Sequence, residues 1–218
     1  MILKDERDMI MSILNEMSEF LQKGKMANVK ELVQKALDEG IAPKVILEDG
    51  LLSGMSVIGE KFKKNEVFVP EVLIAARAMN AGTTMLKPYL VSEGVESKGT
   101  VVIGTVKGDL HDIGKNIVRM MMEGKGLNVI DLGVNVAAEQ YIEAAKEHNA
   151  DIIACSTLLT TTMSEIKNVV ELAKQEQVRA KIMIGGAPVT QDFCDSVGAD
   201  SYTPDAASAA DIALQYCS

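Results

Sequence analysis

A histidine stands between two aspartates in the segment GDLHDIGKN, residues 108–116. Asp109 precedes His111 by two residues and Gly114 follows it by three, which gives the pattern Asp-x-His-x-x-Gly. When one ring nitrogen of an imidazole binds a metal, the other commonly donates to a carboxylate, which fixes the tautomer and raises the basicity of the ligand. Asp109 and His111 on one loop are therefore suited to metal ligation.

The same loop departs from two phosphate-binding motifs. A P-loop has four residues between its first glycine and the Gly-Lys pair, and a Ser or Thr that binds magnesium follows. Here five residues separate Gly108 from Gly114, and Asn116 replaces the hydroxyl residue. The dinucleotide pattern G-x-G-x-x-G is not present either, so we do not expect this loop to bind a phosphate.

His111 cannot build a zinc site by itself, because tetrahedral zinc needs three or four protein ligands. The chain has one other histidine, and Cys155, Cys194 and Cys217 have no CxxC spacing. A metal bound by His111 would therefore arrive with its other ligands, as in a corrin or a haem, which needs one axial ligand from the protein. The motif alone leaves open that His111 only satisfies hydrogen bonds near a helix start.

Composition argues against several other classes of protein. The 218 residues include 22 Lys and Arg, 31 Asp and Glu, and eight aromatic residues, with a formal net charge of −9. This balance offers neither counterion release nor stacking surfaces to a nucleic acid. The N-terminal segment is acidic and no apolar run has the length of a signal peptide or membrane span. We expect a cytoplasmic protein without nucleic-acid or membrane partners.

The apolar residues of residues 1–91 recur with helical spacing in four segments. Asn28 is a candidate N-cap of the second helix and Gly40 a candidate end. Pro43 and Pro70 suit the first turns of the third and fourth helices. Four amphipathic helices with short connections predict a four-helix bundle.

The segment 92–99, SEGVESKG, is polar and without periodicity, which predicts a linker. From residue 100 to residue 218, short apolar runs alternate with helical patterns, as in an α/β fold. This alternation predicts a Rossmann-like (flavodoxin-like) doubly wound parallel sheet of five strands. The apolar runs cover residues 100–106, 128–132, 151–155, 181–185 and 199–202, and the helical patterns cover residues 113–122, 138–148, 163–175 and 191–197.

Ligands of such open sheets bind beyond the carboxyl ends of the strands, where the strand order reverses. KGDLHDIGKN follows the first predicted strand, STLLTTTM the third and GGAP the fourth. With the strand order 2-1-3-4-5, these three segments would lie at one edge of the sheet.

These segments resemble a known family. Residues 38–204 are similar to the cobalamin-binding module of cobalamin-dependent methionine synthase and, more closely, to the free corrinoid proteins of methylamine-type methyltransferase systems. The features that carry this resemblance are GDLHDIGKN, Ser156-x-Leu158, Gly185-Gly186 and FKKNEVFVP at residues 62–70.

The resemblance implies a base-off, His-on cobalamin, in which His111 replaces the cofactor's own benzimidazole as the lower axial ligand of cobalt. Asp109 and Thr162 would form a relay with His111 whose protonation follows the oxidation state of cobalt. Thr162 stands where methionine synthase has Ser, and its β-branched side chain is stiffer. The cofactor-binding residues implied in this way are Asp109, His111, Asp112, Ile113, Gly114, Ser156, Leu158, Thr160, Gly185 and Gly186.

Phe62 and Val69 match, by spacing, two apolar residues that cap the upper face of the corrin in the family, with Val in the place of Leu. Ordinary bundle packing explains Phe62 equally well. An ordinary turn explains Gly185-Gly186, and the polar start of a helix explains residues 160–162.

What the resemblance implies for function is a carrier that moves a methyl group on cobalt. A substrate:corrinoid methyltransferase would load it, and a methylcorrinoid:acceptor methyltransferase would pass the methyl group to a thiol or a tetrahydrofolate-type pterin. A reductive activase is a further expected partner. The chain would act as a corrinoid subunit and not as a complete enzyme alone, with the linker 92–99 as a hinge. Methylamines and betaine are the candidate methyl donors.

Two alternatives remain at this stage. One is a cobalamin-dependent sensor, but no residues are left here for a DNA-binding domain. The other is a receiver-like flavodoxin fold without a cofactor, which leaves the coincidence of three motifs unexplained.

Overall fold

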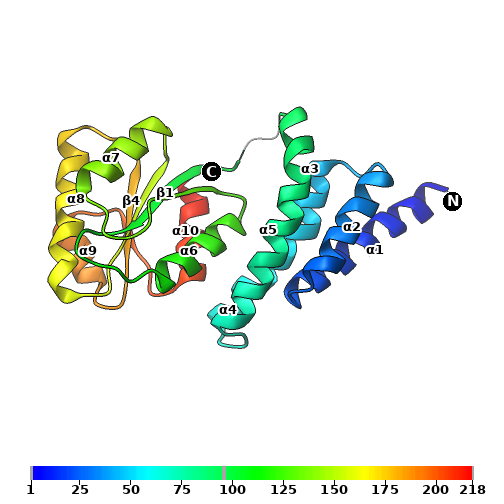
Figure 1. Ribbon diagram of the computed structural model, residues 1–218, viewed down its shortest axis with the longest axis horizontal. Helices are drawn as coiled ribbons and strands as arrows, with labels where there is room; N and C mark the ends of the chain where they lie inside the picture. Colours follow the sequence, from blue (N-terminus) through cyan, green and yellow to red (C-terminus); the bar gives the residue numbers. More distant parts are fainter. Residues whose placement is uncertain (1, 95–96, 218) are drawn as a thin grey trace. The chain divides into compact units, whose positions relative to one another are not determined.

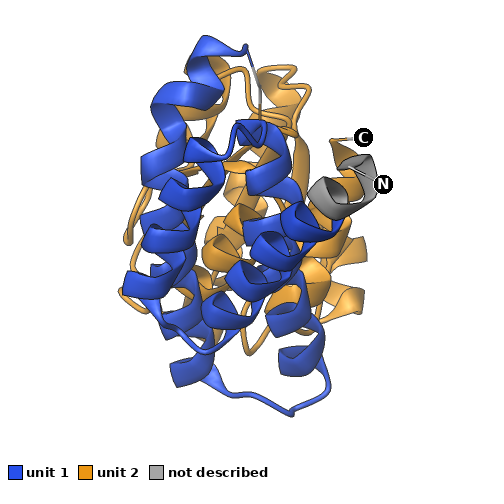
Figure 2. Ribbon diagram, turned by 90° about the vertical axis from the view of Figure 1, so that its right-hand side faces the viewer, with its two compact units in different colours: residues 1–96 blue, residues 97–218 orange. Residues whose placement is uncertain are grey.

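The computed structural model describes residues 2–94 and 97–217. The chain divides into two compact units, residues 1–96 and 97–218 (Figure 2). Residues 95 and 96, which belong to the predicted linker 92–99, lie outside the described residues. Each unit is described by itself below.

The described part of unit 1, residues 2–94, contains helices and no strand, as its apolar periodicity predicts (Figure 1). A π-helical stretch joins α3 to α4 without a break, so α3, η1 and α4 together make one continuous helix. With α1, α2 and α5 it forms the predicted four-helix bundle. One detail of the prediction was wrong: the second helix begins before Asn28, with Lys25 at its N-cap. The elements are α1 (Ile2–Gln22), α2 (Met26–Asp38), α3 (Pro43–Val45), η1 (Ile46–Leu52), α4 (Ser53–Lys63) and α5 (Val69–Ser92).

Unit 2 is built on a five-stranded sheet, in which every neighbouring pair of strands is parallel. The strand order is β2-β1-β3-β4-β5, which confirms the order expected from the sequence. The strands are short and apolar because helices cover both faces. Their bounds are β1 (Thr100–Thr105), β2 (Asn128–Asp131), β3 (Ile152–Ser156), β4 (Lys181–Gly185) and β5 (Ser201–Tyr202).

Helices cover both faces of this sheet (Figure 1). Helices α7 (Ala138–Glu147), α8 (Met163–Gln175) and α9 (Gln191–Val197) pack on one face around Tyr141 and Ile153. Helices α6 (Ile113–Glu123) and α10 (Ala206–Tyr216) lie together on the other. A short 3-10 turn, η2 (Thr160–Thr162), leads into α8.

Helix α10 was not predicted, because the residues that it buries are alanines and not a stripe of large apolar side chains. Its start does carry a recognisable signal. The Asp205 carboxylate accepts a hydrogen bond from the backbone N–H of Ser208 at 2.8 Å, which is the bond of an N-cap.

The register of the strands determines which loops meet. Thr105 at the end of β1 pairs with Ser156 at the end of β3, and Ser156 pairs with Gly185 at the end of β4. The loops after these three strands therefore begin side by side at the carboxyl edge of the sheet. This pairing confirms the expectation that the three motifs share one edge.

Candidate functional site

Asp109 is the centre of the hydrogen bonds at this edge. Its side chain is fully buried, and Oδ2 accepts the backbone N–H of Leu158 at 2.6 Å. Oδ1 accepts the backbone N–H of His111 at 3.0 Å. Burial by itself raises the pKa of this carboxyl, but the bonds from Leu158, from the backbone and ring of His111 and from Thr157 outweigh it and hold the pKa far below its ordinary value. Asp109 is therefore ionised and accepts hydrogen bonds only.

The imidazole of His111 is held by this carboxylate. Its Nδ1 lies 2.7 Å from Oδ1 of Asp109. Since an ionised carboxylate cannot donate, Nδ1 carries the hydrogen of this bond, and the lone pair of a neutral ring is on Nε2. The side chain of His111 is 53% exposed, whereas that of Asp109 is not exposed at all. This arrangement offers one oriented nitrogen ligand to a group outside the sheet edge.

Two hydroxyl groups complete the surroundings of Asp109. Thr162 lies where the sequence places it, with Oγ1 at 3.4 Å from Oδ2 of Asp109. Thr157 was missed, although its Oγ1 is nearer, at 3.1 Å. The signal for Thr157 was its position between Ser156 and Leu158, directly after a buried strand. The carboxylate thus has two threonine partners and not one.

The other predicted residues of the first loop and third loop lie around His111. Asp112 is the N-cap of α6, and its carboxylate accepts the side-chain amide of Asn116 at 3.0 Å. Ile113 and Gly114, the first residues of α6, are exposed, as is Thr160 at the start of η2. Ser156 ends β3 and is half-buried.

The two glycines of the fourth loop have different surroundings. A Cβ atom at Gly185 would meet nothing within 4 Å, so its position faces open space. Gly186 has a φ of 125°, and a Cβ atom there would lie 1.7 Å from the carbonyl oxygen of Thr157. Gly186 is therefore required because a side chain there would collide with the backbone of Thr157, whereas the Cβ position of Gly185 is open.

Exposed apolar side chains on the loops at the carboxyl ends of the strands make up what we call the apolar rim. Among the described residues of unit 2, every large apolar side chain that is exposed belongs to the loops or helix start after β1, β2 and β3. Leu110 and Ile113, on either side of His111, are each 71% exposed. Such a patch marks a binding surface for an apolar group or partner. The rim consists of Leu110, Ile113, Val134, Leu158 and Leu159.

The two predicted capping residues belong to unit 1. Phe62 lies near the end of α4, Val69 is the first residue of α5, and both are half-buried. Between them, Phe68 is 61% exposed, more than either predicted capping residue, and the sequence did not single it out. Its signal was its place in the same apolar segment, VFVP, next to Val69. The backbone N–H of Phe68 donates to the Glu71 carboxylate at 3.0 Å, which fixes the entry to α5.

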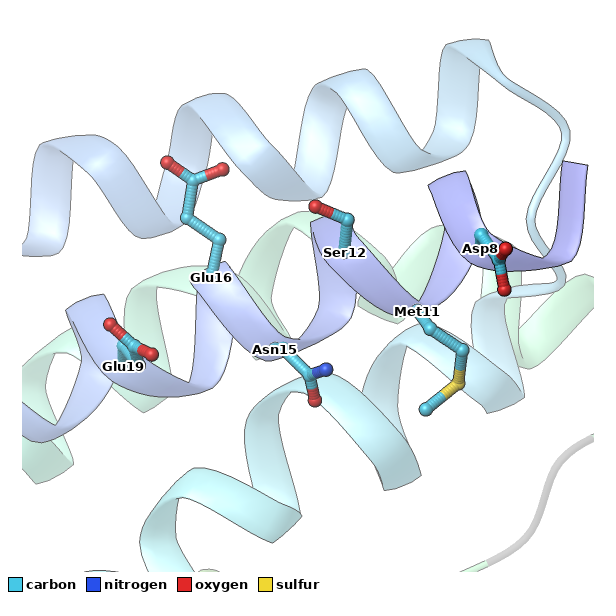
Figure 3. A pocket seen from close by; sticks show the side chains of 6 residues that line it. All are labelled: Asp8, Met11, Ser12, Asn15, Glu16 and Glu19. Atoms are coloured by element: carbon cyan, nitrogen blue, oxygen red, sulfur yellow. The ribbon is translucent and has the colours of Figure 1, made fainter. Parts of the chain in front are cut away.

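A shallow groove on α1 is a separate feature. All its lining side chains come from this helix, among them Asp8, Glu16 and Glu19 (Figure 3). It includes none of the predicted site residues. Within the described ranges, no cluster of three or more His, Cys, Asp or Glu side chains could hold a metal ion. None of the helices described in the structure combines the length and hydropathy of a membrane-spanning helix.

Both units match models of known families. Residues 99–211 match a B12 binding domain, and residues 13–87 match a second family that is also described as a B12 binding domain. Together these matches cover the helical unit and the sheet unit. The match includes the apolar rim and the loop of His111.

Relatives are similar over nearly the whole chain. A corrinoid protein of Desulfitobacterium hafniense (strain Y51) is 41% identical over 210 residues, which are 94% of this chain and 97% of the relative. The dimethylamine corrinoid protein of Methanosarcina barkeri is 43% identical over 200 residues, 90% of this chain and 93% of the relative.

A solved structure has the same fold. The methanol:cobalamin methyltransferase complex MtaBC of Methanosarcina barkeri superposes with a TM-score of 0.86 and 31% identity, over 94% of this chain and 80% of the matched chain. The family matches and the relatives speak against the alternative of a receiver-like fold without a cofactor. The chain belongs to the family of B12-binding corrinoid proteins of methylamine-type methyltransferase systems.

Proposed function

We propose that the chain binds cobalamin with His111 as the lower axial ligand and carries a methyl group between two methyltransferases. The observation that carries this proposal is the exposed imidazole of His111, which the buried Asp109 carboxylate holds through Nδ1 on a loop with exposed apolar side chains. A corrin brings four equatorial nitrogens, so it needs one further nitrogen from the protein. When bound, the corrinoid would supply a cobalt ion that accepts and releases the methyl group.

Asp109 orients and supports the ligand. Its bonds to the backbone of Leu158 and to the ring of His111 connect the third loop to the first. A carboxylate behind an imidazole increases the basicity of the ligand nitrogen, which strengthens its bond to cobalt. Thr157 and Thr162 keep this carboxylate in place in a buried site.

The nucleotide tail would enter next to Gly185. The open space at this glycine and the half-buried hydroxyl of Ser156, its partner in the sheet, support this placement. Leu158 and Ile113 offer exposed apolar surface nearby. We assign Asp112, Gly114 and Thr160, which are exposed on the same loops, to the surroundings of the cofactor.

We also propose that unit 1 shields the opposite face of the corrin through Phe62, Phe68 and Val69. The exposure of Phe68 supports a role outside the core of the bundle. Residues 92–99 would act as the hinge between a helical domain (residues 1–91) and the cobalamin-binding domain (residues 100–218), because the chain must admit each partner in turn.

The proposed partners are a substrate-specific methyltransferase, a second methyltransferase that serves a thiol or a pterin, and a reductive activase. Relatives that are named dimethylamine corrinoid proteins favour a methylamine as the methyl donor. The free thiols Cys155 and Cys194 support a reducing, cytoplasmic location.

The test is the electron paramagnetic resonance spectrum of the Co(II) form. The wild-type protein loaded with cobalamin should show superhyperfine splitting from one protein nitrogen, and His111→Ala should lose it. The chain contains one other histidine, His148 at the end of α7, and His148→Ala is the matched control. Splitting from a protein nitrogen that persists in His111→Ala would overturn the axial assignment, whereas splitting from the cofactor's own benzimidazole would not.

A further inference from the structure

The loop that carries His111 has no helix or strand between β1 and α6, so its shape depends on neighbouring loops. The loop between β2 and α7 lies against it. The backbone N–H of Thr105 donates to Gly133 at 3.0 Å, and the N–H of Val136 donates to Thr105 at 3.0 Å. These bonds extend the pairing of β1 with the β2 side of the sheet as far as the start of the His111 loop.

Asn135 binds this loop with both its side chain and its backbone. Its Oδ1 accepts the backbone N–H of Gly108 at 2.7 Å, and its own N–H donates to the carbonyl oxygen of Asp109 at 3.0 Å. The two bonds hold the polar groups on either side of the Gly108–Asp109 peptide. Both Asn135 and Gly108 have left-handed backbones, with φ values of 56° and 81°. Asparagine tolerates this conformation better than most residues.

We propose that Asn135 is a positioning residue for the axial imidazole. Its side chain fixes Gly108 and its backbone N–H fixes the carbonyl oxygen of Asp109, while the backbone N–H of Leu158 fixes the carboxylate; loss of the side-chain bond frees the Gly108 side of the Gly108–Asp109 peptide. A rotation of the Gly108–Asp109 peptide would move the carboxylate away from the ring of His111, so Asn135 acts on the ligand through Asp109. Asn135 is exposed and contributes little to the core. This inference rests on the proposed function, in which His111 binds cobalt.

Three variants separate the side-chain bond from other effects. Asn135→Gly removes the acceptor but tolerates the left-handed backbone. Asn135→Asp keeps an acceptor oxygen and tolerates the same backbone. Asn149→Gly is the matched control, because Asn149 also has a positive φ, of 46°, and is exposed. It lies between α7 and the start of β3, at the amino-terminal ends of the strands and away from the His111 loop.

Two measurements decide the proposal. In the cofactor-free protein, amide hydrogen exchange of Gly108, followed by nuclear magnetic resonance, should become about tenfold faster in Asn135→Gly, as expected for the loss of one hydrogen bond. In the loaded protein, the Kd for cob(II)alamin should rise about tenfold, at the lower end of the effect of groups behind a metal ligand. The electron paramagnetic resonance titration that gives this Kd should also show a smaller share of the Co(II) with splitting from a protein nitrogen.

Asn135→Asp and Asn149→Gly should stay close to the wild type in both measurements. A wild-type Kd and spectrum in Asn135→Gly would overturn the proposal, and so would an equal loss in Asn135→Asp. If the spectrum of the wild-type protein itself shows no splitting from a protein nitrogen, the axial role of His111 is overturned together with this inference. If the wild-type splitting is present and Asn135→Gly leaves it unchanged, only the role of Asn135 fails.

Discussion

The hydroxyl oxygens of Thr157 and Thr162 lie 2.6 Å apart in the buried space behind Asp109. Thr157 is the nearer of the two to the carboxylate, at 3.1 Å, compared with 3.4 Å for Thr162. Each bond on the route from Thr162 through Thr157 to Asp109 is therefore shorter than the direct bond from Thr162 to Asp109. The third member of the proposed relay is a pair of hydroxyl groups.

A double-mutant cycle tests this pair. Thr157→Val and Thr162→Val keep the side-chain shape and remove one hydroxyl each. Each should lower the free energy of unfolding by about 1–3 kcal/mol, because buried polar groups lose a partner, and Thr157→Val should cost more. The double variant should cost less than the sum by about 1 kcal/mol, since either change interrupts the same path. Urea unfolding of the cofactor-free protein measures all three variants.

Thr161→Val serves as the control for this cycle. Thr161 lies in the same 3-10 turn but is exposed, so its stability should match the wild type. Strictly additive effects of Thr157→Val and Thr162→Val would contradict the hydroxyl pair.

The neighbouring glycines of the fourth loop should respond oppositely to alanine. Gly186→Ala forces a Cβ atom against the carbonyl oxygen of Thr157 at 1.7 Å and strains a φ of 125°. We expect a loss of several kcal/mol, from about 1–3 kcal/mol of backbone strain and a similar steric term of about 1–3 kcal/mol. Thermal unfolding of the cofactor-free protein measures it.

Gly185→Ala should leave this stability within about 1 kcal/mol of the wild type, because nothing lies within 4 Å of its Cβ position. Its affinity for cobalamin should fall, since the methyl group occupies the space proposed for the tail. Wild-type affinity in Gly185→Ala would remove this glycine from the cofactor site.

Lys115 and Asp131 form an ion pair that should make stability depend on pH. Their charged atoms lie 2.6 Å apart, and the Lys115 side chain is 1% exposed. Burial by itself raises the pKa of Asp131, but the bonds from Lys115 and from the Gly133 N–H, with the charges of Lys115 and Arg119, outweigh it and lower the pKa. The pair therefore stabilises the fold fully above the unfolded pKa of about 3.9, and this contribution is lost as the pH falls through the lower folded pKa.

Asp131→Asn should lower the free energy of unfolding by about 3–5 kcal/mol at neutral pH, because it leaves a buried ammonium without its partner. The difference from the wild type should shrink below about pH 4, where the unfolded carboxyl also becomes protonated. Urea unfolding across this range measures it. Glu176→Gln is the control, because Glu176 and Lys146 are half-exposed and should contribute nothing measurable. If the difference in the free energy of unfolding between Asp131→Asn and the wild type grows as the pH falls below about 4, the ion pair is not its cause.

The apolar periods were sufficient to predict the helices of unit 1 and the alternating strands and helices of unit 2, because burial on two faces of a parallel sheet requires near-continuous apolar runs. The strand order was taken from the flavodoxin-like fold class and not from these periods, and the structure has that order. Helix α10 was not predicted because the residues that it buries are alanines, which contribute little to an apolar periodicity. The cap at Asn28 was wrong because the turn after α1 places Met26 already inside the helix. At this position the geometry of the turn between α1 and α2 outweighed the preference of Asn28 for a helix N-cap.

The site was predicted where its residues are close in sequence and was incomplete where they are not. Asp109 and His111 form their own motif. The contacts of Asn135 with Gly108 and of Thr157 with Asp109 join loops that follow different strands. Such pairs depend on register and on left-handed turns, which a single sequence does not specify. Phe68 was missed because its exposure is visible only once α5 is known to begin at Val69.

The apolar rim has a consequence for handling the protein. Leu110 and Ile113 are more than two-thirds exposed, and they share their edge with Leu158 and Leu159. In the proposed complex the corrinoid covers these side chains, so the cofactor-free protein should expose a patch to which hydrophobic dyes, chaperones or other copies of the chain adhere. Cells that lack cobalamin should therefore yield a less soluble product than cells supplied with it, so corrinoid supply during expression governs the quality of the preparation as well as its colour.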